Sequence, residues 1–557
     1  MKKVISFILT LAMSAMVFSG CGNTESGGSS AENSSSGPGE ESSQLSMQVE
    51  PDTFPITETP LAIDMGRATF LGRFENIKEM WKTKDYEKLT GMTVNVKEYP
   101  ETGWQEQIQI ELATGNVQDA YYQIGFTSSQ IFEYSQSGLF IPLDDLIAQY
   151  APNFNKILTE HPEIRQAIQM PDGHIYSLPF IEGDVLTGSN RAYLNQYLME
   201  EAGISEVPKT IDELTAYLTA VKEKNPDMYP VAMQKGNFEH IVNGLMGAYG
   251  IGTAGLKGID SLIDKGLDGK VRFIPSSDQY KELLQLLAGW YDAGLINPES
   301  FTTIDVPKMR NLGENDELAM FIWPNSALAS TDAEIRTHWT AVSQFEGPNG
   351  DRLISSIDAP VRQPYGFVIT NKNENPIETI RWVDYFYGEE GYIYQQVGRE
   401  GESFALNSDG KYEFIGEAKT LNDEGKISYY VGNHGSGYPL YNNNPDYSDK
   451  SRNIYNDLRT DGRPAWQRYQ IAEDDDYMDI LPDEIWPEFT STKDEAEEIG
   501  TIFTDIQSYV SEMQDKFITG AVNIDAEWEN YLSTLDRLNV ADYLEIRQTQ
   551  YERYSSN

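Results

Sequence analysis

Short apolar strands alternate with amphipathic helices from Ile56 onward, and no other feature of the sequence constrains the fold as strongly. Apolar side chains recur at helical spacing before Gly91, a residue type that commonly ends a helix, and at strand spacing directly after it. Strands are expected at residues 93–97, 119–124 and 365–370, and helices at 74–89, 104–113, 239–249 and 377–387. Such alternation predicts an α/β fold of two lobes, each built on a mainly parallel sheet flanked by helices.

The composition is that of a folded protein with a strongly acidic surface. Of the 557 residues, 39% are hydrophobic and 11% aromatic, which is too many bulky apolar groups for a disordered chain. The 87 acidic residues outnumber the 42 basic residues and give a net charge of -45. Because affinity for nucleic acid depends on basic side chains that displace counterions, nucleic acid is excluded as the main partner.

The N-terminus has the pattern of a secretory signal. Two lysines precede a largely apolar stretch, residues 4–18, which is too short to span a bilayer. Cys21 follows and is the only cysteine in the chain, so no disulfide can form and lipidation is the expected use of its thiol. The letters FSGC at residues 18–21 resemble a bacterial lipobox, in which the cysteine is diacylated and becomes the mature N-terminus, although phenylalanine replaces the usual leucine.

A flexible tether is expected between the lipid and the folded part. Residues 1–20 are the expected signal peptide, and residues 21–50 are the lipidated cysteine with a linker rich in serine and glycine. Cleavage removes two of the 42 basic residues and none of the 87 acids, which leaves 40 against 87 and a net charge of -47. About 25 residues of this composition reach roughly 25–30 Å, so the folded part is held near a membrane but tumbles freely.

The motifs of common enzyme sites are missing from the sequence. No two of the five histidines are spaced for a helical metal pair, no G-x-S-x-G elbow occurs, and no cysteine remains for a thiolate site or nucleophile. The G-x-G-x-x-G stretch at residues 250–255 follows a helical run and not a strand, so a glycine turn is preferred over a dinucleotide site. Paired carboxylates for glycoside hydrolysis remain open, because 87 acids supply many chance pairs.

Several separated segments have a recognisable order and spacing over roughly residues 60–554. They are ELATGNVQD (111–119), YSQSGLFIPLDDL (134–146), DGHIYSLP (172–179), AYLNQYLMEEAGI (192–204), PKTIDEL (208–214), WYDAGLINP (290–298), LAM (318–320), RWVDYFYGEEG (381–391), KFITG (516–520) and the closing residues 528–554. Together they resemble the extracellular solute-binding protein family 1, the lipoprotein substrate-binding component of carbohydrate ABC importers in its long Gram-positive form.

The resemblance implies a periplasmic-binding-protein-like fold with two α/β lobes joined by hinge crossovers. A ligand is then held in the cleft between the lobes and enclosed when they close. The first lobe is expected at residues 51–188 plus about 366–430, and the second at 189–365 plus about 431–557.

Metal sites are not expected. Many long relatives carry a calcium loop rich in Asp and Asn before the strand that enters the second lobe. Here the stretch at residues 224–230, KNPDMYP, has one carboxylate, whereas calcium needs six to eight oxygens. The acidic stretch at residues 473–498 lacks the glycine of an EF-hand turn, so we expect a solvated acidic surface there. We therefore expect no metal and no cofactor.

A sugar site needs aromatic platforms together with polar groups that pair with hydroxyls. By analogy with maltodextrin-binding relatives, aligned on residues 134–138, Phe126 falls where a ring stacks, and Ser129 and Gln130 fall where hydroxyls are held. A core phenylalanine and a helix-capping serine explain these residues about as well, each taken alone. The same analogy points to further ligand positions at Ser189, Asn237, Phe238, Trp323 and Asn325.

Other candidates rest mainly on composition, and packing or surface exposure explains each of them better by about two to one. Arg73 precedes the first helix, and the corresponding loop contacts the ligand in relatives. Gln363 and Tyr365 precede a strand expected to cross between the lobes. Large aromatic residues in loops rich in Gly, Asn and Pro have less reason to be core, and these are Tyr438, Tyr441 and Trp466.

The function expected from the resemblance is capture of a carbohydrate, in particular an oligosaccharide, by a non-catalytic, monomeric protein. The protein would be lipid-anchored on the extracellular face of the cell membrane of a Gram-positive bacterium and would deliver its ligand to the permease subunits of an ABC transporter. Two alternatives remain open. A secreted glycan-active enzyme needs two carboxylates about 5–10 Å apart in a cleft, whereas a structural surface lipoprotein needs no deep cleft.

The lone cysteine generates a first prediction. Replacement Cys21→Ala removes the thiol that would carry the lipid, so the protein is expected to move from the cell membrane into the medium. Fractionation of cells that express the two forms measures this. A variant that stays in the membrane fraction as fully as the wild-type protein would show that the anchor is not this thiol.

Overall fold

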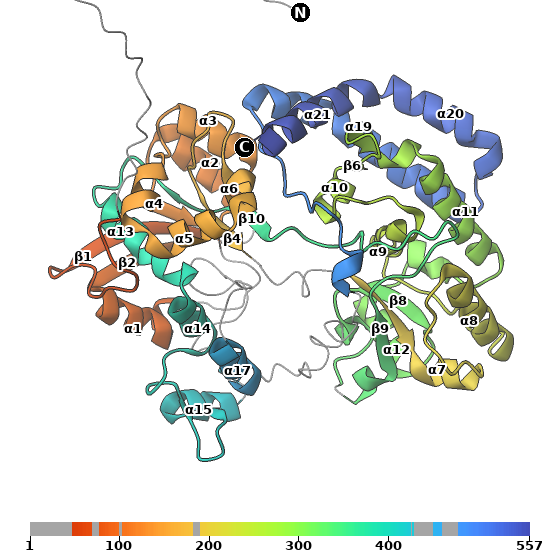
Figure 1. The fold of residues 1–557 in the computed structure, drawn as a ribbon, viewed down its shortest axis with the longest axis horizontal. Helices are drawn as coiled ribbons and strands as arrows, with labels where there is room; N and C mark the ends of the chain where they lie inside the picture. The colour runs from red at the N-terminus through yellow and green to blue at the C-terminus, as the bar shows by residue number, and fades with distance from the viewer. Residues whose placement is uncertain are drawn as a thin grey trace, which may run out of the picture. The chain divides into compact units, whose positions relative to one another are not determined.

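The computed structural model describes residues 47–68, 77–99, 103–181, 190–332, 334–424, 426–427, 449–458 and 477–556. The chain divides into two compact units, Met1–Gln44 and Leu45–Asn557, and the described residues all belong to the second. Helices and strands alternate along these residues, so the predicted α/β class is confirmed (Figure 1). Within the described ranges, no helix is long and apolar enough to cross a bilayer.

The first lobe is built on a five-stranded sheet of order β2-β1-β3-β10-β4. Its strands are β1 (Leu61–Ala68), β2 (Met92–Tyr99), β3 (Ala120–Tyr122), β4 (Leu178–Ile181) and β10 (Val361–Ile369). β1 pairs parallel with β2 and β3, as predicted, whereas β10 runs antiparallel to both β3 and β4. The expected strands at residues 93–97 and 119–124 correspond to β2 and β3, and β10 contains most of the third.

Both faces of this sheet are covered by apolar cores. Met65 and Tyr122 lie in one cluster of buried residues, and Tyr121 and Val368 lie in another, because successive side chains of a strand point to opposite faces. The helices of this lobe are α1 (Trp81–Thr90), α2 (Trp104–Thr114), α3 (Ser128–Gln136), α4 (Asp144–Tyr150), α5 (Pro152–Glu160), α6 (Pro162–Ile168), α13 (Pro376–Asp384) and α14 (Glu389–Val397), with short 3-10 turns η1 (Ile77–Glu79) and η7 (Tyr385–Tyr387). α13 packs against α4 and α5 although more than 200 residues separate them in the chain.

Gly91 ends α1 as the sequence predicts. Its φ of 76° is left-handed, and its N–H donates to the carbonyl of Glu87 at 3.0 Å. A Cβ at this position would lie 2.5 Å from the carbonyl oxygen of Thr57, so both the turn and the close approach require glycine. The turn sends the chain directly from α1 into β2.

The second lobe contains a three-stranded sheet of order β8-β5-β9. Its strands are β5 (Arg191–Asn195), β8 (Met320–Trp323) and β9 (Trp339–Val342). β5 runs antiparallel to both neighbours, so the expectation of parallel ladders is wrong for this sheet. The reason is topological: β8 and β9 run in the same direction, and β5, which follows β4 of the first sheet in the chain, is inserted between them in the opposite direction.

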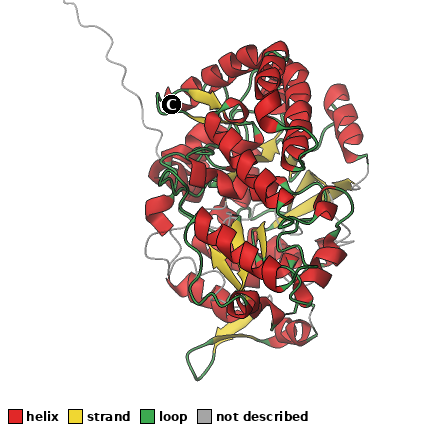
Figure 2. Ribbon diagram, turned by 90° about the vertical axis from the view of Figure 1, so that its right-hand side faces the viewer, coloured by secondary structure: helices red, strands yellow, loops and turns green. Residues whose placement is uncertain are grey.

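Figure 2 shows strands lying among helices in this part of the chain. One large apolar core unites this sheet with the helices around it. The helices are α7 (Gln196–Glu201), α8 (Ile211–Lys224), α9 (Glu239–Leu245), α10 (Leu256–Asp260), α11 (Asp278–Asp292), α12 (Val306–Glu314), α19 (Lys493–Ile518), α20 (Ile524–Arg537) and α21 (Val540–Ser556). Short elements complete the lobe: the hairpin of β6 (Ile263–Lys265) and β7 (Val271–Phe273), and the turns η2 (Met246–Tyr249), η3 (Ile274–Ser276), η4 (Pro298–Phe301), η5 (Ser326–Leu328), η6 (Ile335–His338) and η8 (Tyr477–Ile480). α19 packs on α11 and α21 of this lobe and also meets α3 of the first.

A small separate core lies beyond α14. It joins the hairpin of β11 (Phe404–Leu406) and β12 (Tyr412–Phe414) with α15 (Gly416–Asp423) and α17 (Asp449–Leu458). α17 packs against α14 and β12, although the expected second segment of the second lobe, about 431–557, includes it. The lobe boundaries therefore stay a prediction. The contacts of α17 indicate that the chain returns from the first lobe to the second after α17 and not at about residue 431.

A pair of carboxyl groups ties the first described segment to the first lobe. Asp384 on α13 is buried and accepts hydrogen bonds from the N–H groups of Asn153 and Phe154 at 3.1 and 2.8 Å. The Asn153 side chain donates to both Asp384 and Asp52, at 3.2 and 3.0 Å. Burial raises the pKa of Asp384 to about 7; the hydrogen bonds oppose this shift, and the nearby charge of Asp52 adds to it.

A raised pKa in the folded state makes stability fall as pH rises. A buried acid of this kind is favoured in its protonated form, so its contribution is present in acid and is lost as pH rises through about 7. Asp52→Asn keeps an oxygen acceptor for Asn153, suits the left-handed φ of 52° and removes the neighbouring charge. We expect this variant to be more stable than the wild-type protein at pH 8, on the order of 1 kcal/mol, and to gain little at pH 5.

Urea unfolding of both proteins at the two pH values measures the effect. Glu50→Gln is the matched control, because it removes one charge from an exposed side chain of the same segment. Equal gains at pH 5 and pH 8, or equal behaviour of the two variants, would contradict the coupling of Asp52 to Asp384.

Candidate ligand-binding site

Four side chains meet where the chain passes between the two sheets. Asn190 directly precedes β5, and Ser356 lies shortly before β10. The Asn190 amide nitrogen donates to Ser356 Oγ at 2.7 Å and lies 3.1 Å from His240 Nδ1. The His240 ring, at the start of α9, is set edge-on to Trp323 at the end of β8, with ring centroids 4.6 Å apart. We call Asn190, His240, Trp323 and Ser356 the His240 cluster.

The His240 cluster carries no net charge at neutral pH. Burial lowers the pKa of His240 below its ordinary value, so the neutral form of the ring is favoured at neutral pH. With the Asn190 amide oriented as a donor, Nδ1 accepts and the ring proton lies on Nε2. The hydrogen bond from Asn190 to Nδ1 then fixes the orientation of the ring and of its Nε2–H group.

Trp323 supplies the apolar surface of this cluster. Its side chain is partly exposed and packs on the edge of the second-lobe core, beside the neutral imidazole. A ring of this kind next to amide, hydroxyl and N–H groups can stack on the C–H face of a sugar while the polar groups pair with its hydroxyls. The prediction of Trp323 as a ligand platform therefore stays in place.

The first-lobe loop after β3 uses its side chains locally. Phe126 is 7% exposed, and its ring lies 5.4 Å from Phe140 in the core. Thr127 and Gln130 form a capping box at the start of α3, and the Ser129 hydroxyl lies 3.0 Å from that of Thr127. Contact of Phe126, Ser129 and Gln130 with a ligand stays a prediction.

The remaining described candidates lie in varied surroundings. Phe238 is 4% exposed, and its ring lies 4.5 Å from that of Phe301. Asn237 is partly exposed just before α9, and Asn325 caps η5 by accepting from the N–H of Ala327. Gln363 on β10 is exposed, whereas Tyr365 is buried. Cys21, Arg73, Ser189, Tyr438, Tyr441 and Trp466 lie outside the described residues.

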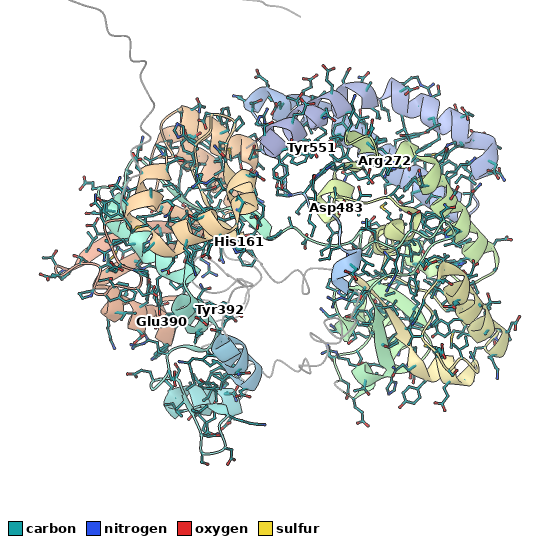
Figure 3. All side chains as sticks on the ribbon, in the orientation of Figure 1. His161, Arg272, Glu390, Tyr392, Asp483 and Tyr551 are labelled. Carbon is teal, nitrogen blue, oxygen red and sulfur yellow. The ribbon has the colours of Figure 1, made fainter. Side chains whose placement is uncertain are left out.

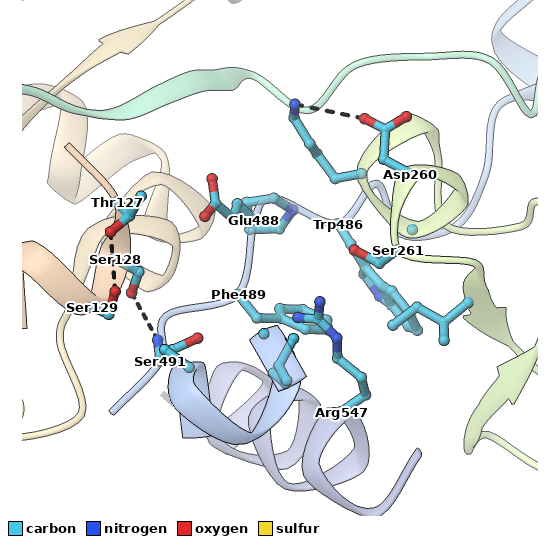
Figure 4. A pocket seen from close by; sticks show the side chains of 17 residues that line it. Thr127, Ser128, Ser129, Asp260, Ser261, Trp486, Glu488, Phe489, Ser491 and Arg547 are labelled. Carbon is cyan, nitrogen blue, oxygen red and sulfur yellow. Dashed lines mark hydrogen bonds and ion pairs between the residues drawn. The ribbon is translucent and has the colours of Figure 1, made fainter. Parts of the chain in front are cut away.

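A cavity of about 350 Å³ lies where the two lobes meet the C-terminal helices (Figure 4). Its walls come from the first turn of α3, from α10, from residues 486–491 and from α19 and α21, and Ser129 is among them. The N–H of Ser491 donates to Ser128 Oγ at 2.7 Å across it, and Lys257 pairs with Asp260 at 3.9 Å. Burial raises the pKa of Glu488, and the positive charges of Lys257 and Arg547 partly oppose this shift.

A second cavity, of about 540 Å³, lies inside the second lobe between α9, α10, α11 and α19. The rings of Phe238 and Phe301 line it, and Glu239, Asp260 and Asp515 stand around it. Burial raises the pKa of each of these three carboxyl groups. Phe238 thus lines this cavity, whereas Asn190, Trp323 and Ser356 do not.

The glycine-rich stretch at residues 250–255 is a turn after a helix, as predicted. Gly250 caps η2 with a φ of 64°. The N–H groups of Gly252 and Thr253 donate to Asp264 Oδ2 at 2.8 and 3.4 Å, and the same carboxylate pairs with Arg272 at 2.7 Å. Arg272 belongs to β7 of the second lobe and is labelled in Figure 3. Amides that would hold a pyrophosphate in a dinucleotide site are therefore occupied by a side chain.

Metal-ligating side chains do not gather in the part of the chain that the structure describes: no group of three His, Cys, Asp or Glu there is placed to hold a metal ion. In the stretch at residues 224–230, the ammonium of Lys222 donates to the carbonyl of Met228 at 2.8 Å and lies 4.7 Å from the Tyr229 ring centroid. A lysine thus ties this loop to α8.

Sequence reasoning missed His240, Asn190 and Ser356. The spacing of the histidines excludes a helical metal pair and does not single out His240, although His240 follows the predicted loop residues Asn237 and Phe238 by three and two positions. Asn190 likewise adjoins the predicted Ser189. The available signal was therefore proximity in sequence to candidate loops, and the contact with Ser356 joins residues 166 positions apart.

Comparisons with known proteins agree with this architecture. The model of the bacterial extracellular solute-binding protein family matches residues 71–393. The fructooligosaccharide ABC transporter substrate-binding protein FusA of Streptococcus pneumoniae is 26% identical over 486 residues, 85% of this chain and 86% of FusA. Lipoprotein LipO of Bacillus subtilis is 23% identical over 376 residues, 62% of this chain and 71% of LipO.

Solved structures show the same fold. FusA in complex with kestose superposes with a TM-score of 0.66 at 24% identity, over 89% of this chain and 100% of that chain. An HMO-binding, ABC-transporter-associated solute-binding protein from Bifidobacterium longum infantis superposes with a TM-score of 0.70 at 19% identity, over 89% and 99%. With the family match over more than half of the chain, these likenesses show that the chain belongs to the bacterial extracellular solute-binding protein family.

Proposed function

We propose that the protein captures a neutral oligosaccharide between its lobes and delivers it to the permease of an ABC transporter. The observation that carries the proposal is the His240 cluster, which places a partly exposed tryptophan beside uncharged hydrogen-bonding groups where the chain passes between the two sheets. Ligand sites prefer such junctions between lobes. The likeness to FusA, a substrate-binding protein of a fructooligosaccharide transporter, supports both the ligand class and the transport role.

The proposed location is the extracellular face of the cell membrane, where the protein acts as a lipid-anchored monomer. The signal-like N-terminus and the lone Cys21 support the anchor, and one relative, LipO, is named a lipoprotein. No catalytic step is proposed. A glycan-active enzyme would shorten the bound sugar, and a structural lipoprotein would bind none, so both alternatives are open to direct test.

Thermal unfolding with a panel of oligosaccharides tests the proposal. A ligand that binds only the folded state adds RT ln(1 + [L]/Kd), about 2.7 kcal/mol at a concentration 100 times Kd. We expect a neutral oligosaccharide to raise the unfolding temperature and to be recovered intact after prolonged incubation. A shortened product would indicate an enzyme, and a panel without any effect would leave the structural alternative.

The charge of the ligand is a separate prediction. The mature chain carries a net charge of -47, which disfavours approach of an anionic sugar, and the His240 cluster is neutral. Kestose or another neutral oligosaccharide is therefore expected to bind more tightly than an alginate trisaccharide of similar size. Calorimetric titration compares the two, and tight binding of uronate sugars alone would overturn this prediction.

The two aromatic candidates of the second lobe should respond differently to truncation. Trp323→Ala is expected to weaken oligosaccharide binding about tenfold or more and to change the unfolding temperature little, since the ring is partly exposed. Phe238→Ala is expected to cost about 3–5 kcal/mol of stability, because its ring is 4% exposed and packs on Phe301. Affinity and unfolding temperature of both variants check this. Loss of stability without loss of affinity in Trp323→Ala would remove Trp323 from the site.

A further inference from the structure

The cavity inside the second lobe is separate from the proposed oligosaccharide site. Its volume of about 540 Å³ lies within the range of about 300–1,000 Å³ that is usual for small-molecule sites, and its walls come from α9, α10, α11 and α19. No member of the His240 cluster lines it. The cavity therefore offers a place for a second ligand.

The floor of this cavity is apolar and largely aromatic. Phe238 and Tyr280 are 4% and 2% exposed, and the Phe238 ring lies 4.5 Å from the partly buried ring of Phe301. Four further apolar side chains complete the floor: Met246, Ile259, Ile274 and Val510. Such a surface favours an apolar body, and the faces of aromatic rings also attract a cation.

One buried hydroxyl group on the wall has an unused hydrogen. Ser300 is fully buried and lines the cavity. Its Oγ accepts from the N–H of Met233 at 3.1 Å, but among the described residues no group accepts the hydrogen of this hydroxyl. Buried polar groups are normally satisfied, so the hydroxyl can donate to an oxygen of a bound molecule.

The rim of the cavity carries only negative charge. Glu239 begins α9, Asp260 ends α10, and Asp515 lies on α19, all at the solvent-exposed side. No lysine, arginine or histidine is among the described residues that line the cavity. In this part of the chain Lys257 pairs with Asp260 at 3.9 Å, whereas Glu239 and Asp515 form no ion pair.

The three carboxylates are close enough to repel one another. Partial burial raises the pKa of Glu239; its own backbone N–H opposes this shift, and the charges of Asp515 and Asp260 add to it. The Asp515 charge also adds to the effect of burial in raising the pKa of Tyr280 on the floor. A bound cation relieves this repulsion, whereas an anion increases it.

We propose that this cavity binds an organic amine, with an aromatic body on the floor and the ammonium group among Glu239, Asp260 and Asp515. The site goes beyond the proposed function, because it takes a second ligand of opposite character to a neutral sugar. A sugar would leave the carboxylates without a counter-charge, and a polyamine would leave the apolar floor unused.

Three compounds that differ in one group test the charge requirement. Tyramine carries an ammonium group, an aromatic ring and a phenol oxygen that can accept from Ser300. Tyrosol replaces the ammonium group by a hydroxyl, and 4-hydroxyphenylacetate replaces it by a carboxylate. In calorimetric titrations of the full chain we expect tyramine to bind with a Kd of about 1 mM or below, tyrosol to bind about tenfold more weakly, and 4-hydroxyphenylacetate not to bind.

Two substitutions remove rim charges at nearly constant size. Asp515→Asn and Glu239→Gln are each expected to weaken tyramine binding about three- to tenfold, with an unfolding temperature close to that of the wild-type protein. Glu498→Gln is the matched control, because it removes an exposed carboxylate of α19 about 25 Å along the helix from Asp515. At that distance the charge is screened, so the control should keep the wild-type affinity.

Weaker tyramine binding by both rim variants, with the control unchanged, supports the site. Equal affinity for tyramine and tyrosol, wild-type affinity in both rim variants, or no tyramine binding at millimolar concentration overturns it. Spermidine that binds as tightly as tyramine also overturns it, because the rim alone would then suffice. Oligosaccharide titrations of the same samples keep the two proposals apart: sugar binding without tyramine binding removes only this site, and tyramine binding without sugar binding removes only the proposed function.

Discussion

The pairing of β10 with β3 and β4 is the interaction on which the rest of the structure depends. β10 brings the chain from the second lobe into the first sheet between β3 and β4, with Phe367 opposite Tyr122 and Val361 opposite Ile181. Gly366 accepts from the N–H of Gln123, and Ser356, just before the strand, receives the hydrogen bond from Asn190. One antiparallel strand therefore positions both the edge of the first lobe and the His240 cluster of the second.

The chain as a whole is strongly acidic, whereas the candidate ligand-binding site is uncharged. Acidic residues outnumber basic ones by about two to one, yet the His240 cluster is neutral. The neutrality of His240 follows from burial, which disfavours its charged form. Uncharged or internally paired groups can discriminate among hydroxyl patterns, because each unpaired hydrogen bond costs more in a desolvated site than in water.

Local signals in the sequence predicted much of the fold. Gly91 ended the first predicted helix, and the strand at residues 93–97 and the helix at 104–113 are β2 and α2 within two residues at each end. These features depend on neighbours in the chain, through helix capping and the period of apolar residues. The antiparallel second sheet was not predictable in this way, because the direction of β5 relative to β8 depends on residues about 130 positions apart.

The candidate site, like the fold, was predictable from the sequence only in part. The sequence by itself determined the α/β class, the acidic charge, the lone cysteine behind a signal-like segment, and the loops in which ligand contacts are expected. Tertiary structure alone decided that the Phe126 and Phe238 rings pack into cores, that Trp323 stays partly exposed beside His240, and that Glu239, Asp260 and Asp515 stand around one cavity. The physical reason is that a side chain's burial and partners are set by elements distant in the chain, whereas composition and local periodicity report only its immediate neighbours.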